Sequence, residues 1–170
     1  MRINSSYKLL PGNEAMEGGY RPFFGNDQQT WGSYAYGRRG AVNFHGHQRH
    51  SADVDFWIEP KEGNFKRLVK AFNEMGHEIG DFPKEVKEGH QNISIKFSPA
   101  DLNLELITNF SVNKSFDQAY EEAEEASLED QPQLKWKVLN LDDLITSKIK
   151  AGRPKYLADV QQLKRINNKK

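Results

Sequence analysis

Two aspartates, Asp53 and Asp55, occupy alternate positions in a segment that reads Asp-Val-Asp-Phe-Trp-Ile. Alternate residues of a β-strand point to the same face, so the strand would bring the two carboxylates close together. Placing two like charges side by side is costly unless a cation compensates them. Hard oxygen ligands of this kind suit Mg²⁺ or Mn²⁺. The pair therefore indicates either a divalent metal site or two acids on an exposed strand face.

A third acid, Glu105, lies in a second alternating segment, Leu-Asn-Leu-Glu-Leu-Ile at 102–107. Its three leucines share one face and Glu105 lies on the other. If this strand lies beside 53–58, Glu105 joins Asp53 and Asp55 in a three-carboxylate site. Such a site can hold one or two divalent ions that bridge the phosphates of a nucleotide. The other interpretation is an exposed glutamate on an edge strand.

The elements that would position these acids can be predicted from hydrophobic spacing. Residues 53–58 alternate as a half-buried strand, and apolar residues at helical intervals predict an amphipathic helix over 64–75. Strands are expected at 93–97, 102–107 and 136–139, and a solvated helix over the acidic stretch 117–130. Asn140 and Gly152 bracket a helix over 141–151, and Pro154 opens a last helix to about 166. The predicted core consists of Val54, Phe56, Phe65, Leu68, Phe72, Leu104, Leu106, Leu144 and Leu163.

This order of elements predicts an α+β (α/β-like) domain over 40–166, with a small mixed sheet, flanking helices and a C-terminal helical pair. A short helix ending in glycine is expected at 41–46. Residues 1–39 show neither helical nor strand periodicity, and Gly12 to Gly37 is interpreted as loop. A reading frame advanced by one base over residues 16–39 can encode a helix and a strand ending in Val-Gly-Gly. We therefore hypothesise that this irregular N-terminal segment is frame-shifted.

Composition and charge limit the function classes. The chain has 170 residues, of which 36% are hydrophobic and 28% charged, as in a soluble globular domain. Lys plus Arg and Asp plus Glu both number 24, so no net charge attracts nucleic acid or membrane, although segregated charge can hide in such a total. The absence of cysteine excludes disulfides and thiolate zinc sites. With no secretory leader or membrane span expected, we predict a cytoplasmic protein without a membrane partner.

Two linked motifs resemble the nucleotidyltransferase superfamily, specifically the small bacterial branch that includes abortive-infection-type toxins. The first motif is a short helix ending in His-Gly, followed by an arginine, a serine and an Asp-hydrophobic-Asp strand; it comprises residues 41–46, Arg49, Ser51, Asp53 and Asp55. The second is a helical lysine followed by Gly-Arg-Pro-Lys and an aspartate; it comprises Lys148, Gly152, Arg153, Pro154, Lys155 and Asp159. The resemblance covers about residues 40–165.

The resemblance implies the nucleotidyltransferase fold and a metal-dependent reaction. A nucleoside monophosphate would pass from a nucleoside triphosphate to an acceptor hydroxyl, with Mg²⁺ or Mn²⁺ held by Asp53, Asp55 and Glu105. Contacts to the nucleotide are implied for Gly40, Arg49, Ser51, Lys148 and Asp159. Lys148 is expected on the open side of the cleft. The acceptor is a tRNA, a protein or a small molecule, and an antitoxin-like partner is implied for the branch that includes toxins.

The sequence departs from the family at two positions. Gly37-Arg38-Arg39-Gly40 stands where the family has Gly-Gly, a turn that approaches the triphosphate closely. Tyr156 stands where the family tends to have an acid. The first departure supports an alternative function: a catalytically weakened or inactive module that binds a nucleotide or a partner protein. His45, His47 and His50 lie in a turn without a fourth metal ligand, so we assign them structural or phosphate-contacting roles rather than a zinc site.

Overall fold

The computed structural model describes residues 34–48, 53–74, 76–97, 102–127 and 135–168. One six-stranded mixed sheet, in the order β3-β4-β2-β1-β6-β5, runs through this part of the chain. The strands are β1 (Tyr34–Tyr36), β2 (Asp53–Ile58), β3 (Ile93–Phe97), β4 (Leu102–Ile107), β5 (Glu124–Ser127) and β6 (Lys135–Val138). The helices are α3 (Arg38–Phe44), α4 (Glu62–Glu74), α5 (Lys84–Lys87), α6 (Phe116–Glu122), α7 (Leu141–Ala151) and α8 (Pro154–Asn167).

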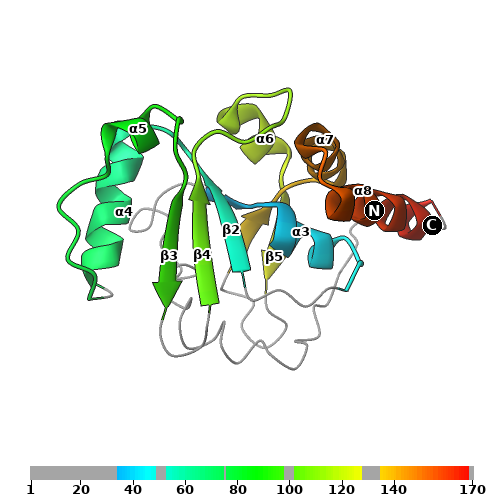
Figure 1. Ribbon diagram of the computed structural model, residues 1–170, viewed down its shortest axis with the longest axis horizontal. Coiled ribbons are helices and arrows are strands. Elements are labelled where there is room, and N and C mark those ends of the chain that lie inside the picture. The colour runs from blue at the N-terminus through cyan, green and yellow to red at the C-terminus, as the bar shows by residue number, and fades with distance from the viewer. Residues whose placement is uncertain (1–33, 49–52, 75, 98–101, 128–134, 169–170) are drawn as a thin grey trace.

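The sheet is mixed because it contains both parallel and antiparallel pairs of strands. β2 runs parallel to β4 and antiparallel to β1, while β1 runs parallel to β6. Each edge is an antiparallel pair, β3 with β4 and β5 with β6. Helices α4 and α5 lie near the β3 end of the sheet, and α7 and α8 lie at the opposite side (Figure 1). The fold is therefore α+β with a small mixed sheet, as the order of elements predicted.

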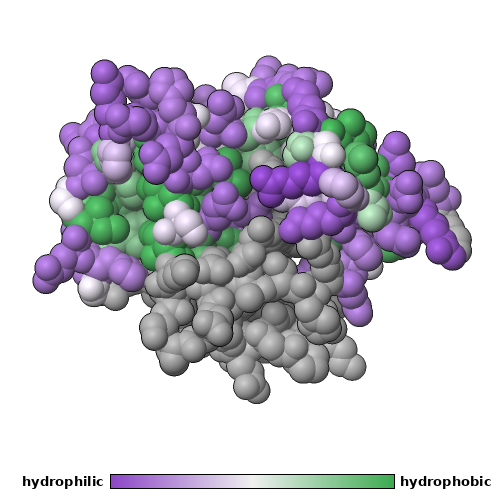
Figure 2. Space-filling model, viewed as in Figure 1, coloured by the Kyte–Doolittle hydropathy of each residue, from purple (hydrophilic) through white to green (hydrophobic). Residues whose placement is uncertain are grey.

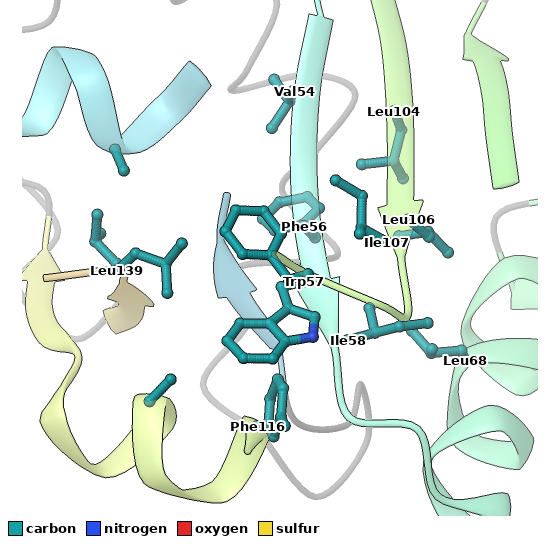
Figure 3. Packing of buried hydrophobic residues seen from close by; sticks show 14 of the residues in the cluster. Val54, Phe56, Trp57, Ile58, Leu68, Leu104, Leu106, Ile107, Phe116 and Leu139 are labelled. Carbon is teal, nitrogen blue, oxygen red and sulfur yellow. The ribbon is translucent and has the colours of Figure 1, made fainter. Parts of the chain in front are cut away.

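The predicted core is confirmed: all nine residues are buried. On α4, Phe65, Leu68 and Phe72 are at most 1% exposed, because their helical spacing gathers them on the face that packs against the sheet. Strand β2 is not half-buried, which is a correction. Both Phe56 and its neighbour Trp57 are buried (Figure 3). The indole of Trp57 stacks on Phe110 at a centroid distance of 5.2 Å. A strand between two partners, with side chains covering both faces, buries both sets of residues.

Three further predictions need correction. The acidic stretch 117–130 is not one helix: α6 ends at Glu122 and β5 pairs with β6, burying Ala126. The loop predicted up to Gly37 includes β1, where Ala35 is 1% exposed between two strand partners. The short helix expected at 41–46 begins instead at Arg38. Strands of three or four residues carry too little periodicity to be recognised alone, and sheet pairing decides their conformation. Residues 1–33, including most of the suspected frame-shifted segment, lie outside the described part.

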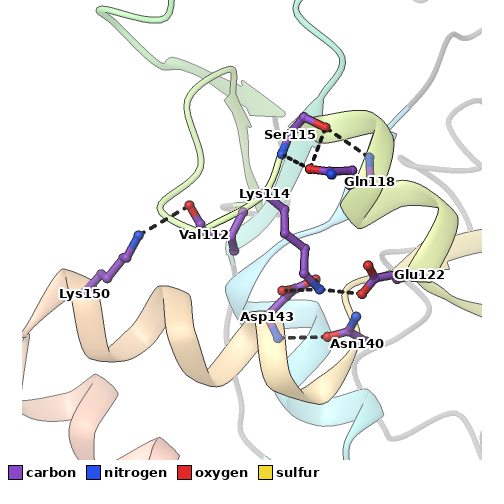
Figure 4. A network of polar contacts seen from close by, with 8 residues as sticks. All are labelled: Val112, Lys114, Ser115, Gln118, Glu122, Asn140, Asp143 and Lys150. Atoms are coloured by element: carbon purple, nitrogen blue, oxygen red, sulfur yellow. Dashed lines mark hydrogen bonds and ion pairs between the residues drawn. The ribbon is translucent and has the colours of Figure 1, made fainter.

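A polar network joins the loop before α6 to the start of α7 (Figure 4). Lys114 forms ion pairs with Glu122 and with the buried carboxylate of Asp143, whose Oδ1 lies 3.0 Å from Nζ. Asn140 Oδ1 accepts a hydrogen bond from the Asp143 backbone N–H at 2.8 Å, which caps α7 as predicted. At the other end of α7, Gly152 adopts a left-handed φ of 62° and closes the helix. Both ends of the helix that carries Lys148 are therefore fixed.

Replacing Asn140 with Ala is expected to lower the free energy of unfolding by about 1 kcal/mol, because one N–H at the start of α7 loses its acceptor. Urea unfolding followed by circular dichroism measures the change. Asn168→Ala is the matched control, since Asn168 lies exposed at the end of α8 and no hydrogen bond of its side chain is found within the described chain. Equal losses in the two variants would contradict the capping role.

Among the helices that the structure describes, none combines the length and apolar character that a membrane crossing requires.

Candidate functional site

The turn between β1 and α3 lies directly against Asp55. The backbone N–H of Gly37 donates a hydrogen bond to the carbonyl oxygen of Asp55 at 2.7 Å. A Cβ atom at position 37 would lie 2.6 Å from Asp55 Oδ2 and 3.0 Å from its Cγ. Gly37 has an ordinary extended backbone, with φ −81° and ψ −154°, so the close approach, and not the backbone angles, requires glycine here. Asp55 itself is 3% exposed, so the turn and the sheet hold its carboxylate in a narrow place.

Gly37→Ala is expected to lower the free energy of unfolding by about 1–3 kcal/mol, because the added methyl group overlaps a carboxylate and a backbone oxygen in a packed region. Thermal and urea unfolding measure this loss. Gly63→Ala is the control: its Cβ would meet only Arg67 Nη1 at 3.8 Å, and Ala is favoured over Gly inside a helix such as α4. A Gly37→Ala variant as stable as the Gly63→Ala variant would show that the turn and Asp55 are not tightly packed.

Asp55 and Glu105 are direct neighbours across the two central parallel strands. Their Cα atoms are register partners in the β2–β4 pair. Adjacent strands lie about 4.8 Å apart, and paired residues project to the same face of a sheet. Glu105 is partly exposed, and its Oε1 accepts a hydrogen bond from Asn92 Nδ2 at 3.4 Å. Two of the three predicted acids are therefore placed side by side, one buried and one facing solvent, with the hard oxygen donors that Mg²⁺ or Mn²⁺ prefers.

The third acid, Asp53, begins β2 opposite Asn103 of β4. Its side chain lies outside the described part of the chain, and so do Arg49 and Ser51. Within the described residues, no group of three or more His, Asp or Glu side chains is arranged to hold a metal ion. The three-carboxylate site, with its Arg49 and Ser51 contacts, remains a prediction.

Lys148 of α7 and Asp159 of α8 form a buried ion pair. Lys148 Nζ donates to Asp159 Oδ2 at 2.8 Å, and the two side chains are 0% and 6% exposed. Burial lowers the pKa of Lys148 from its ordinary value, while the hydrogen bond and charge of Asp159 and the charge of Asp55 act in the opposite direction. Lys148 Nζ also lies 4.5 Å from the centre of the Tyr156 ring. Lys148 is thus within electrostatic reach of Asp55, although it is buried and not on the open side of a cleft.

His47 connects the pair to the turn after α3, a link that the sequence analysis did not identify. Its Nε2 lies 3.6 Å from Asp159 Oδ1. His45 has a structural position: its Nε2 lies 2.8 Å from the carbonyl oxygen of Leu139, and its own carbonyl oxygen accepts a hydrogen bond from Asn167 Nδ2 at 3.2 Å. The turn after α3 is therefore attached to α8 and to the segment that precedes α7. His50 lies outside the described residues.

Gly40 and Tyr156 are two positions at which the sequence was compared with the nucleotidyltransferase pattern. Gly40 lies inside α3 and is half-buried, while Gly37 occupies the turn at the carboxylate. Gly37, and not Gly40, is the glycine that adjoins Asp55, and the nucleotide contact implied for Gly40 stays a prediction. Tyr156 is buried, with the side chains of Lys148, Arg153 and Lys155 around its ring. The position where the family has an acid is here part of a packed cationic environment.

The elements that converge are β2, β4, the two turns that flank α3, and the pair α7 and α8, which pack on each other. They bring together the acid pair of Asp55 and Glu105 and the Lys148–Asp159 ion pair, which His47 approaches. No model of a known protein family matches the chain, and no curated protein matches it. The interpretation of the site accordingly depends on its residues and their geometry.

Proposed function

We propose that the protein is a metal-dependent nucleotidyltransferase of nucleotidyltransferase fold, which transfers a nucleoside monophosphate from a nucleoside triphosphate to an acceptor hydroxyl. The observation that carries the proposal is the buried Asp55 carboxylate, which lies against the Gly37 turn with Glu105 beside it on the next strand. A glycine turn of this kind lets the backbone lie directly against the carboxylate, and backbone N–H groups of such turns can bind phosphate. Asp55 and Glu105 would hold Mg²⁺ or Mn²⁺, together with Asp53.

A bound divalent ion would supply charge neutralisation on the phosphates and polarise the group that is attacked. The chain's own residues have separate tasks. Asp55 is fixed by its strand and by the Gly37 turn, so it offers a preorganised ligand. Glu105, which is partly exposed, is placed to accept a proton from an entering hydroxyl. Lys148, held by Asp159 at 2.8 Å, lies within electrostatic reach of Asp55.

The alternative is a module that binds a nucleotide but transfers it weakly or not at all. It is favoured by Arg38, which directly follows Gly37 where the family has a second glycine. The two functions share a binding step and differ in the chemical step. One experiment can therefore separate them if it measures both.

The purified protein is incubated with Mg²⁺ or Mn²⁺, a cell extract and each of the four α-³²P-labelled nucleoside triphosphates. We expect label to become covalently attached to an acceptor, and EDTA to prevent it. Digestion with ribonuclease or protease then identifies the class of acceptor. In parallel, calorimetry measures nucleotide binding with and without the metal. Binding without any labelled product would favour the inactive module, and neither binding nor labelling would overturn both functions.

A further inference from the structure

Positive charge is concentrated at the C-terminal end of this neutral chain. Residues 144–170 contain eight Lys and Arg and a single acid, Asp159, which gives a net charge of +7. The preceding 143 residues contain sixteen Lys and Arg against 23 Asp and Glu, a net charge of −7. A zero total therefore hides a strong separation of charge. From the sequence alone, this basic end either contacts a polyanion or offsets the acidic stretch 121–130.

Three acids of this stretch, Glu122, Glu124 and Glu125, lie beside residues outside α8. Glu122 pairs with Lys114, and Glu125 pairs with Lys135 at 2.7 Å. Glu124 lies 3.9 Å from His45 Nδ1. The α8 cations, by which we mean Arg153, Lys155, Lys164 and Arg165, are all exposed. Within the described ranges of the chain, none of the four forms an ion pair with an acid.

Helix stability does not account for all of these charges. Lys164 and Arg165 lie in the last turn of α8, where the helix dipole favours cations. Arg153 and Lys155 flank its first residue, where the dipole disfavours them, and the first turn contains no acid. The only acid of α8, Asp159, faces inward to Lys148. The helix thus keeps cations at both ends at some cost to its own stability, which is typical of a binding surface.

The α8 cations start beside the candidate site and extend away from it. Arg153 and Lys155 lie 5.5 and 5.7 Å from the centre of the Tyr156 ring, which also contacts Lys148. Arg165 follows Lys155 by ten residues, which is about 15 Å along the helix at a rise of roughly 1.5 Å per residue and within about a quarter-turn around it at 3.6 residues per turn. Helix α8 forms the right-hand edge of the molecule, where Figure 2 shows a hydrophilic surface. A charged strand lying along α8 would therefore reach the residues around Lys148, whose pKa the charge of Asp55 acts to raise.

We propose that the α8 cations bind the phosphodiester backbone of a nucleic-acid strand, and that a hydroxyl of this strand is the acceptor in the transfer reaction. The inference rests on the proposed function, whose acceptor it names. Spaced cations without acids between them match a row of phosphates. Gln161 and Gln162 are exposed on the same helix and offer further hydrogen bonds to phosphate or sugar.

Two other polyanionic partners fit α8 less well. A protein interface needs an apolar centre, but Leu157 is the one exposed large hydrophobic residue among the described residues of α8. A membrane-bound helix needs a free apolar face, but the apolar residues Tyr156, Val160 and Leu163 are buried. A nucleic-acid strand requires neither. Acidic proteins and anionic membranes are therefore outcomes to be tested against it.

The test is fluorescence anisotropy of the full chain with labelled 20-nucleotide RNA and DNA strands of the same sequence, at several salt concentrations and without metal or nucleotide. The test variant is Lys164→Gln/Arg165→Gln, which lies at the far end of α8 from the site. We expect its Kd at about 0.1 M salt to rise roughly 10- to 30-fold, and the salt slope to fall by about 1.4, because two phosphate contacts are lost. The control is Lys70→Gln/Lys84→Gln, which removes two exposed lysines elsewhere and should bind like the wild type.

Comparison of the RNA and DNA strands shows whether ribose or deoxyribose is preferred. Binding of either nucleic acid through the α8 cations supports the proposal. Equal losses in the two double variants would overturn it, as would the absence of binding at low salt. Tighter binding of polyglutamate or of phosphatidylserine vesicles through the same residues would also overturn it. Strand binding through α8 without nucleotide transfer would contradict the proposed function and the acceptor role that depends on it, but not the binding surface on α8. Transfer to another acceptor without strand binding would contradict this inference alone.

Discussion

Asp55→Asn is expected to reduce nucleotide transfer by roughly 10³-fold while leaving the fold intact. The substitution keeps the shape of the side chain and removes the negative charge that would hold the metal ion. Charge stabilisation by such an ion contributes several kcal/mol to the barrier, and each 1.4 kcal/mol corresponds to about tenfold in rate. The hydrogen bond from Gly37 goes to the backbone carbonyl of Asp55, which the substitution preserves. The loss should therefore be chemical and not structural.

Three measurements distinguish this result from unfolding. Initial rates with a labelled nucleoside triphosphate give the loss of activity, and electron paramagnetic resonance of Mn²⁺ gives the loss of metal binding. Urea unfolding reports whether the variant is folded. Asp117→Asn is the matched control, because Asp117 is an exposed carboxylate of α6 that pairs only with the exposed Lys61 among the contacts described. Transfer by Asp55→Asn at the rate of this control would eliminate Asp55 as a metal ligand.

The features that could be predicted from sequence are those that local spacing determines. Phe65, Leu68 and Phe72 repeat at helical intervals, so their burial follows once α4 forms. Asn140 and Gly152 mark the two ends of α7 because each supplies what a helix end lacks, an acceptor at the start and a left-handed residue at the finish. The pairing of Asp55 with Glu105 required the further assumption that β2 and β4 are neighbours, and this is confirmed.

Contacts between segments that are far apart in the sequence could not be predicted from it. β1 has three residues and no periodicity of its own, so its pairing with β2 and β6 was missed, and so was the contact of Gly37 with Asp55. A lysine on an amphipathic helix is usually solvated, and nothing local to Lys148 indicates that α8 will cover it and supply Asp159. Short strands and buried ion pairs depend on tertiary contacts, which a single sequence does not display.

Asp159→Asn is expected to lower the free energy of unfolding by about 3–5 kcal/mol. Lys148 is 0% exposed, so removing its carboxylate partner leaves an ammonium group buried without a compensating charge. Combining Lys148→Met with Asp159→Asn should cost less than the sum of the losses caused by the two single variants, because the double variant removes both charges of this ion pair. The difference between this double variant and the sum of the single variants measures the coupling of the pair.

The pH dependence of Asp159→Asn gives a second, independent result. Asp159 raises the pKa of Lys148 against the effect of burial, so without Asp159 the pKa of Lys148 in the folded state should lie further below its ordinary value of 10.5. Between these two values the unfolded chain binds more protons than the folded one, so the free energy of unfolding rises with pH. The deficit of the variant relative to wild type should therefore shrink as the pH increases from 7 toward 10. A deficit that stays constant over this range, measured by urea unfolding at each pH, would show that Lys148 is not the buried charge that Asp159 stabilises.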